Sequence, residues 1–211
     1  MRFKRAIILP LTLALTACSE ALPRVNLPGE TVGAITLFAF NGDSERVPGT
    51  MNLGHAFVGV TNLTDEAYQV GGYRLQPQET VTIGSWSMSG HFGLWYNIEN
   101  YYMNEKGRYE GRLSLDQDFS ASALNAINEY LYDHDYWSLF KNCSYLALNL
   151  FNLCRPEAER LEVSGTVTPG KIYDLLLDEP EAEVDYLPAL TGQIGWAEDD
   201  GKGEFIAYEG E

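Results

Sequence analysis

A cysteine at a predicted helix start is the residue of this chain best suited to chemistry. Cys143 directly follows Asn142, a residue type preferred at helix N-caps. It begins an apolar stripe of helical spacing, formed with Leu146, Ala147 and Leu150. The unsatisfied N–H groups and the dipole at a helix start favour a thiolate and stabilise a developing oxyanion. The position therefore predicts a nucleophile, although it also suits a cysteine that merely begins a buried stripe.

A nucleophilic thiol needs a base, and the chain offers three histidines. His55 begins an apolar run over residues 54–60 that predicts a core strand, so a rigid element would hold its ring. His91 lies in a glycine-flanked connection, and His134 lies between two aspartates in a predicted solvated turn. We therefore expect His55 to serve as the base.

The third cysteine of the chain, Cys154, follows Cys143 by eleven residues. Along a continuous helix their Cα atoms would lie about 16 Å apart. A disulfide requires a Cα separation of about 4.4–6.8 Å. The spacing excludes a bridge between them within an unbroken helix and indicates that Cys154 is a small core residue.

The His and Cys motifs together resemble a known superfamily. Gly54-His55-Ala-Phe-Val and Asn142-Cys143-Ser-Tyr-Leu-Ala are similar to motifs of circularly permuted papain-like cysteine hydrolases. These are relatives of the NlpC/P60 peptidases in which the His strand precedes the Cys helix. The resemblance covers roughly residues 34–175. It implies an α+β fold in which an antiparallel sheet packs against the Cys-bearing helix.

The resemblance also implies roles for individual residues. Cys143 would be the nucleophile and His55 the base. A polar residue on the next strand would orient the imidazole, which points to Gln69, with Glu66 and His91 as alternatives. Asn142 would either cap the helix or contribute to the oxyanion pocket.

The N-terminal segment predicts export and a lipid anchor. Three basic residues precede an apolar run from Ala6 to Ala17, which is too short to span a bilayer. Leu15-Thr-Ala-Cys18 resembles the lipobox of bacterial lipoproteins, which implies cleavage after residue 17 and acylation of Cys18. Ser19 after the anchor favours the outer membrane. The expected location is the bacterial cell envelope, facing the oxidising periplasm.

The chain is expected to comprise one folded domain with two appendages. A tether at residues 18–33 follows the signal, and the α+β domain covers residues 34–177. Within the domain, short β-rich runs continue to residue 115, and residues 94–103 suit either a strand or a helix. Helices are predicted to begin after Ser120, at Cys143 and near Thr168.

Residues 178–211 contain eleven acidic residues and one lysine, which predicts a solvated acidic tail. The same segment includes Tyr186, Trp196 and Phe205, which have the apolar character to dock on the domain.

Composition narrows the possible functions. The chain has 211 residues and a net charge of −16, which opposes binding to a nucleic-acid backbone. Its 45% hydrophobic content is sufficient for a packed core. The sequence contains no recognisable metal-ligand spacing and no nucleotide-binding glycine motif, so no cofactor is expected.

Two kinds of function remain open. The first is a thiol hydrolase that cleaves an amide or ester bond, with cell-wall peptide as the natural substrate, or a related lipid or protein acyltransferase. The second is a non-catalytic envelope lipoprotein that uses the same scaffold for binding or assembly. In that case, the aromatic stretch at residues 95–102 would line a groove. The expected partners are the membrane, through the anchor, and peptidoglycan or envelope proteins.

Overall fold

The computed structural model describes most of the chain from residue 29 onward. The described residues are 29–42, 54–88, 90–134, 138, 141–188, 192–197 and 204–208. The predicted signal peptide, Cys18 and most of the tether lie outside them. Among the described residues, no helix combines the length and apolar character needed to cross a bilayer.

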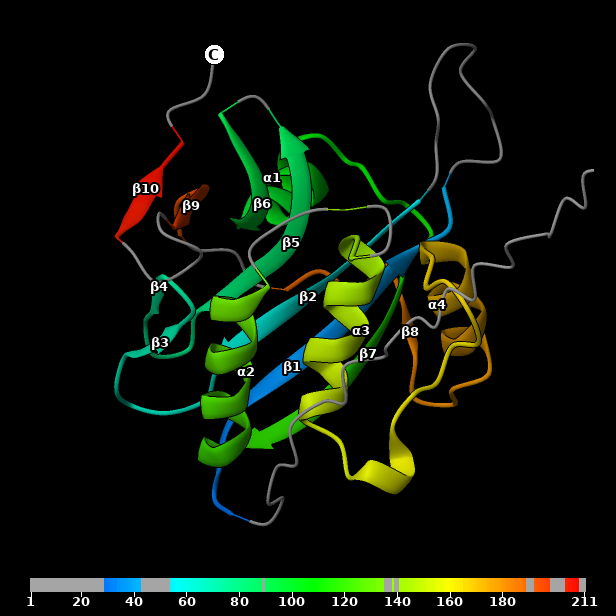
Figure 1. The fold of residues 1–211 in the computed structure, drawn as a ribbon, viewed down its shortest axis with the longest axis horizontal. Coiled ribbons are helices and arrows are strands. Elements are labelled where there is room, and N and C mark those ends of the chain that lie inside the picture. Colours follow the sequence, from blue (N-terminus) through cyan, green and yellow to red (C-terminus); the bar gives the residue numbers. More distant parts are fainter. Residues whose placement is uncertain are drawn as a thin grey trace, which may run out of the picture.

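An eight-stranded antiparallel sheet forms the centre of the molecule (Figure 1). Its strand order is β10-β9-β6-β5-β2-β1-β7-β8. The strands are β1 (Thr31–Phe40), β2 (His55–Asn62), β5 (Thr80–Met88), β6 (His91–Tyr96), β7 (Leu113–Ser120), β8 (Glu183–Val184), β9 (Gly195–Ala197) and β10 (Phe205–Ala207). A separate hairpin is formed by β3 (Tyr68–Val70) and β4 (Tyr73–Leu75).

Helices cover both faces of this sheet. The four α-helices are α1 (Ile98–Glu105), α2 (Ala121–Asp133), α3 (Cys143–Leu153) and α4 (Pro169–Leu177), and a short 3-10 helix spans Glu157–Glu159. Helices α2 and α3 lie in front of the sheet, and α1 lies behind β5 and β6 (Figure 1). The molecule is therefore an α+β protein whose antiparallel sheet packs against the Cys-bearing helix, as predicted for the class.

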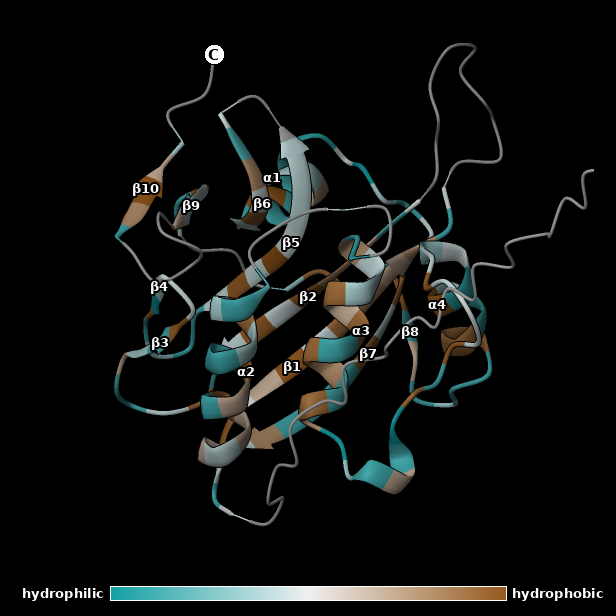
Figure 2. Cartoon of the chain, viewed as in Figure 1, coloured by the Kyte–Doolittle hydropathy of each residue, from teal (hydrophilic) through white to brown (hydrophobic). Residues whose placement is uncertain are grey.

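The alternation of side chains along β1 and β2 separates two apolar clusters. Ala56 and Val58 point to the larger cluster, which contains the buried residues of α2 and α3. Phe57, on the opposite face, joins Phe38 and Met103 of α1 in a smaller cluster. Hydrophobic residues accordingly line the strands and the facing sides of the helices (Figure 2). His55 has the same parity as Phe57, so its side chain starts from the face that α1 covers.

Strands β2 and β5 separate at one end of the sheet. They pair from Thr61 opposite Thr80 as far as Val58 opposite Ile83. Beyond this point, β2 extends from Val58 back to His55. Strand β5 extends from Ile83 to Met88 and pairs with β6 along this stretch. Between His55 and Val58, one edge of β2 therefore has no pairing with β5. The opening between the two strands is where groups from the two faces of the sheet can meet.

The acidic C-terminal segment is built into the domain. Strand β8 pairs with β7, β9 pairs with β6, and β10 pairs with β9. The buried Arg112 side chain donates to the carbonyl oxygens of Asp185 and Tyr186 and lies 3.3 Å from the Asp185 carboxylate. The Tyr186 ring stacks on Phe38. In the described parts of this segment, main-chain pairing and aromatic contacts hold the backbone on the sheet, while Glu183 and Asp185 are exposed to solvent.

Candidate active site

A Cys–His–Glu arrangement lies at the opening between β2 and β5. Glu99 is fully buried on α1, and its Oε1 lies 3.1 Å from Nε2 of His55. The Cys143 thiol at the start of α3 lies close enough to the same imidazole for the two side chains to shift each other's pKa. The His55 ring thus links a carboxylate from the helix behind the sheet to a sulfur from the helix in front of it.

Three hydrogen-bonding side chains hold Glu99 in place, and a neighbouring glycine leaves room for its carboxylate. Trp86 donates its indole N–H to Oε1 at 2.5 Å, and the Thr82 hydroxyl donates to Oε2 at 3.2 Å. His55 is the third partner. A Cβ at Gly84 would overlap Oε1 of Glu99, so this strand position accepts only glycine beside the carboxylate. The carboxylate is buried but well provided with donors, which is the condition for keeping a charge inside a protein.

The electrostatics of the site favour a thiolate–imidazolium pair. Burial opposes the charged form of His55, but the charge of Cys143 and hydrogen bonds to Cys143 and Glu99 raise its pKa from 6.5 to about 10. Burial also opposes the thiolate, but the charge and hydrogen bond of His55 lower the pKa of Cys143 below 9.0. Hydrogen bonds from the Ala56 backbone N–H and the Ser144 hydroxyl add to this lowering.

The start of α3 is fixed by the predicted N-cap. Asn142 accepts hydrogen bonds from the backbone N–H groups of Ser144 at 3.0 Å and Tyr145 at 3.1 Å. Its side-chain amide donates to the Val167 carbonyl oxygen at 3.2 Å. Asn142 therefore caps the helix and orients Cys143, while an oxyanion role for its amide stays a prediction.

A strained tyrosine covers the histidine. Tyr109 has a φ of 63°, a left-handed conformation that bulky residues rarely adopt. Its ring stacks on His55 with centroids 5.7 Å apart and also contacts Phe57 at 5.9 Å. Arg112 binds the Tyr109 carbonyl oxygen through its backbone N–H at 3.1 Å and its guanidinium at 3.3 Å. The aromatic rings of Tyr109, Phe57 and Trp86 around His55 therefore restrict the motion of its imidazole.

The structure brings together Cys143 and His55 but not the predicted third residue. Gln69 lies on β3 of the separate hairpin with its side chain exposed, and its carbonyl oxygen accepts from Asn128. Glu66 is exposed in the loop before that hairpin. His91 lies on β6, where it stacks on Trp196. The assignment of Gln69 as the orienting group is corrected to Glu99, which hydrogen-bonds to the imidazole from α1 rather than from the next strand.

Glu99 had a recognisable signal in the sequence. It is the lone carboxylate in the aromatic-rich run of residues 94–103, and acidic residues in apolar runs are buried only when they are paired. That run divides into the end of β6 and helix α1, so the residues that were ambiguous between strand and helix form both.

The two cysteines of α3 differ in character. Both are free thiols, and Cys154 is buried in the larger cluster, where burial raises its pKa. Cys143 is partly exposed and has its pKa lowered. Among the described residues, no three His, Cys, Asp or Glu side chains gather as a metal-ligand set.

Replacement of Gly84 by alanine is expected to make Cys143 less reactive by displacing Glu99, which lies behind the sheet. The added methyl group would displace the Glu99 carboxylate, which costs about 1–3 kcal/mol of stability. Cys143 should lose reactivity with a thiol reagent at neutral pH. Urea unfolding and alkylation rates measure the two effects, and Gly29→Ala, at an exposed position remote from the site, should change neither.

A double variant tests whether the methyl group added at Gly84 acts by displacing the Glu99 carboxylate. Glu99→Ala removes the carboxylate that Gly84→Ala would strike, so the second substitution should destabilise the protein less in that background than in the native one. Equal losses in both backgrounds would contradict the proposed overlap.

The fold and site thus define an α+β protein in which a partly exposed cysteine lies beside a buried histidine that a buried carboxylate supports. Comparison of the chain with protein-family models, with curated proteins and with solved structures found no significant match.

Proposed function

We propose that this chain is a thiol hydrolase of the bacterial cell envelope that cleaves an amide or ester bond. The observation that carries the proposal is the position of His55 between the Cys143 thiol and the buried Glu99 carboxylate. A partly exposed thiolate paired with an imidazolium is the resting state of a cysteine nucleophile.

The roles follow from the geometry. The Cys143 thiolate would attack the carbonyl carbon, and the His55 imidazolium would donate its proton to the leaving nitrogen or oxygen. Water would then hydrolyse the thioester, with the neutral imidazole as base. Glu99 would orient the ring and stabilise its charged form. The backbone N–H of Cys143, at the first turn of α3 where no intrahelical acceptor exists, can donate to the oxyanion.

The wider assignment combines the site with the sequence. A His strand that precedes the Cys helix supports the circularly permuted papain-like arrangement. The lipobox-like segment ending at Cys18 supports a lipid anchor, with the outer membrane and the periplasm as the place of action. Cell-wall peptides are the amide-bearing substrates accessible there, so we propose peptidoglycan as the partner.

Acyl-enzyme formation tests the function. The purified chain should hydrolyse p-nitrophenyl acetate or release peptide fragments from purified peptidoglycan, with a transient acyl group on Cys143 detected by peptide mass spectrometry. Cys143→Ala should abolish both hydrolysis and acylation, whereas His91→Ala should retain them. Hydrolysis of either substrate by Cys143→Ala at the native rate would overturn the proposal.

A further inference from the structure

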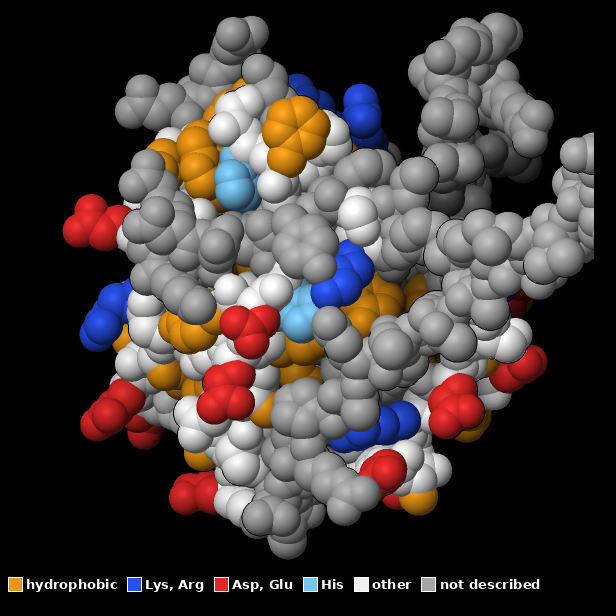
Figure 3. Space-filling view, viewed as in Figure 1, with side chains coloured by type: hydrophobic (Ala, Val, Ile, Leu, Met, Phe, Trp, Pro, Cys, Tyr) orange, Lys and Arg blue, Asp and Glu red, His pale blue; other side chains and the backbone are white. Residues whose placement is uncertain are grey.

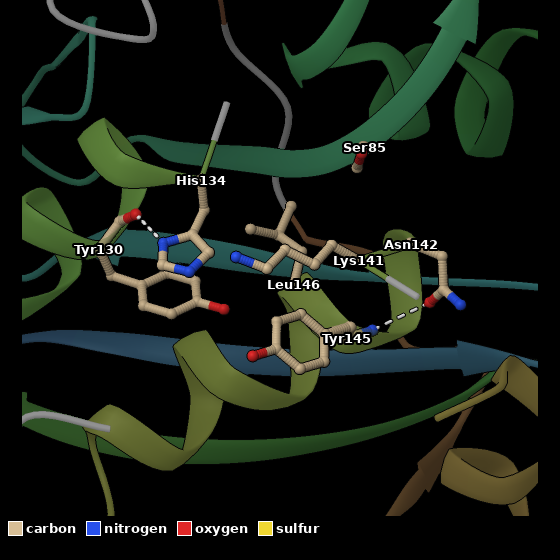
Figure 4. A pocket seen from close by; sticks show the side chains of 7 residues that line it. All are labelled: Ser85, Tyr130, His134, Lys141, Asn142, Tyr145 and Leu146. Carbon is tan, nitrogen blue, oxygen red and sulfur yellow. Dashed lines mark hydrogen bonds between the residues drawn. The ribbon is translucent and has the colours of Figure 1, made fainter. Parts of the chain in front are cut away.

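The aromatic rings that pack on the histidine lie behind the sheet, on the side of α1. On the front, Asn142 is bonded to the backbone of Tyr145 at the start of α3, and the pocket beside them has a volume of about 10 Å³, room for about one water (Figure 4). The described acidic and basic side chains are scattered over this face rather than gathered in one patch (Figure 3). Behind the sheet, the loop between α1 and β7 brings Tyr109 against His55 and the smaller apolar cluster. This loop is therefore placed to control the imidazole.

Three residues of this loop have a left-handed backbone, and one of them is a tyrosine. Gly107, Tyr109 and Gly111 have φ values of 57°, 63° and 78°. Glycine adopts this conformation freely, whereas a side chain makes it unfavourable. A Cβ at Gly107 or Gly111 would meet nothing within 4 Å, so glycine serves the backbone alone at these two positions. The tyrosine at the middle position carries a conformational cost that the contacts of its ring must offset.

The Tyr109 ring meets the histidine with its face. It stacks on His55 with centroids 5.7 Å apart and an interplanar angle of 26°. It also contacts Phe40 at 5.5 Å and Phe57 at 5.9 Å. None of the hydrogen bonds among the described residues involves the Tyr109 hydroxyl. Burial raises the pKa of Tyr109, and the charge of Glu99 adds to this, so the ring stays neutral beside the imidazolium.

Buried Arg112 holds the left-handed conformation of Tyr109. Its backbone N–H and its guanidinium both donate to the Tyr109 carbonyl oxygen, at 3.1 and 3.3 Å. The same guanidinium donates to the carbonyl oxygens of Asp185 at 2.8 Å and Tyr186 at 2.9 Å. Asp185 is itself left-handed, with a φ of 56°, and its carboxylate accepts from the Gly111 N–H at 2.7 Å. One arginine thus joins two left-handed residues from distant parts of the chain.

We infer that Arg112 and the turn at residues 185–186 form a clamp that keeps Tyr109 on His55, and that Tyr109 is a positioning residue of the proposed active site. The clamp residues are absent from the groups that shift the pKa of His55 or Cys143. The clamp therefore acts through the position of the ring and not through its own charges. The inference rests on the proposed function, since it concerns the same Cys–His pair. It makes the C-terminal segment a contributor to the reactivity of the thiol.

The pH profile of Cys143 alkylation by iodoacetamide tests the role of the ring. Without the ring, water reaches the imidazole and the imidazole moves more freely, which weakens its interaction with the thiolate. In Tyr109→Ala, the midpoint of the profile should therefore move to higher pH by roughly one unit, an effect comparable to the loss of one aromatic contact. Tyr109→Phe keeps the ring and should keep the native midpoint. A loss of stability alone does not move the midpoint of the folded protein.

Tyr109→Gly separates the strain of the backbone from the contact of the ring. Glycine suits a φ of 63°, so this variant should unfold at a higher temperature than Tyr109→Ala. Both variants lack the ring, and both should show the shifted midpoint. A native midpoint in Tyr109→Gly would show that the ring does not position His55 and would overturn the inference.

Arg112→Lys tests the clamp. Lysine keeps the positive charge but lacks the planar set of donors that reaches three carbonyl oxygens. The midpoint should move in the same direction as in Tyr109→Ala, whereas Arg74→Lys, on the exposed side of β4, should leave it unchanged. In a Tyr109→Ala background, Arg112→Lys should cause no further shift, because the clamp acts through the ring. A native midpoint in Arg112→Lys, or an equal shift with and without the ring, would overturn the clamp.

The same data separate this inference from the proposed function, because alkylation needs no substrate of the enzyme. A chain that hydrolyses neither ester nor peptide, but whose variants shift the midpoint as expected, would overturn the hydrolase and leave the effect of the clamp on the thiol in place. A chain that hydrolyses its substrate, with the native midpoint in every variant, would overturn the clamp alone.

Discussion

In a His55→Ala variant, Cys143 is expected to lose at least about 30-fold of its alkylation rate at pH 7. Without the imidazolium, burial raises the thiol pKa, and the charge that counteracts this is gone. A thiol with a pKa of about 8.5 or above is at most about 3% ionised at pH 7, so a 30-fold loss is the result expected of a native pair that is largely thiolate. Iodoacetamide labelling followed by peptide mass spectrometry measures the rate at each cysteine separately.

The pH dependence of hydrolysis and of alkylation shows in which direction His55 and Cys143 shift each other's pKa. In the native protein the reactive ion pair forms as pH rises through the lowered pKa of Cys143. Its imidazolium is lost as pH rises through the His55 pKa of about 10. Hydrolysis should therefore show a broad plateau between these two values. In His55→Ala, alkylation should instead rise only in the alkaline range, above the pKa of an ordinary thiol.

The chain contains its own controls for this experiment. Cys154 should stay unreactive in the folded state of every variant, because it is buried and its pKa is raised. His91→Ala should leave Cys143 unaffected. His55→Gln keeps a hydrogen-bond donor for Glu99, so it provides a second test where the alanine variant misfolds. Native alkylation rates at Cys143 in both His55 variants would show that the imidazole does not activate the thiol.

Glu99→Gln is expected to lower hydrolysis at the alkaline end of the plateau, above about pH 10, by up to about tenfold for each pKa unit lost at His55. The charge and hydrogen bond of Glu99 both raise the His55 pKa. Their loss should move the alkaline limb of the pH profile from about 10 to lower values. The same loss makes the imidazolium less stable, and the imidazolium is what stabilises the thiolate. The acidic limb of the pH profile should therefore move to higher pH, and the plateau should narrow.

A second buried carboxylate supplies the matched control. Glu79 accepts from the Tyr73 hydroxyl at 2.6 Å and from the Gln76 N–H at 2.7 Å, outside the candidate active site. Glu79→Gln should reduce stability in a comparable way without moving either limb of the pH profile. A profile for Glu99→Gln that keeps both limbs, with only a lower melting temperature, would assign Glu99 a purely structural role.

The local elements of the site could be predicted because short-range rules determine them. Asn142 before an apolar stripe predicted the start of α3, and Thr168 before Pro169 predicted α4. The apolar run after His55 predicted β2. These signals lie within a few residues of the element that they define, so no knowledge of the tertiary structure was needed.

The third member of the site could not be placed by the same rules. Its identity depends on α1 returning behind the sheet and on β5 leaving β2 after Ile83. Such packing is decided by residues far apart in the chain. The family pattern placed the orienting group on the strand after the histidine, which led to Gln69, whereas this chain supplies it from a helix on the opposite face.

The strand pairing of the C-terminal segment could not be predicted for a related reason. Its high acidic content predicted solvation, but composition gives no information about main-chain pairing. Buried Arg112 binds Asp185 and Tyr186, and two further short strands pair through backbone atoms. The acidic side chains can face solvent while the backbone completes the sheet.

This arrangement places the C-terminal segment on both borders of the sheet at once. Strand β8 covers β7 on one side, and β9 with β10 covers β6 on the other. A chain that ended before Glu183 would leave two unpaired strand borders, each able to pair with another molecule. The C-terminal segment therefore replaces the longer edges of β6 and β7 with short strands and supports the aromatic cover of His55 through Arg112.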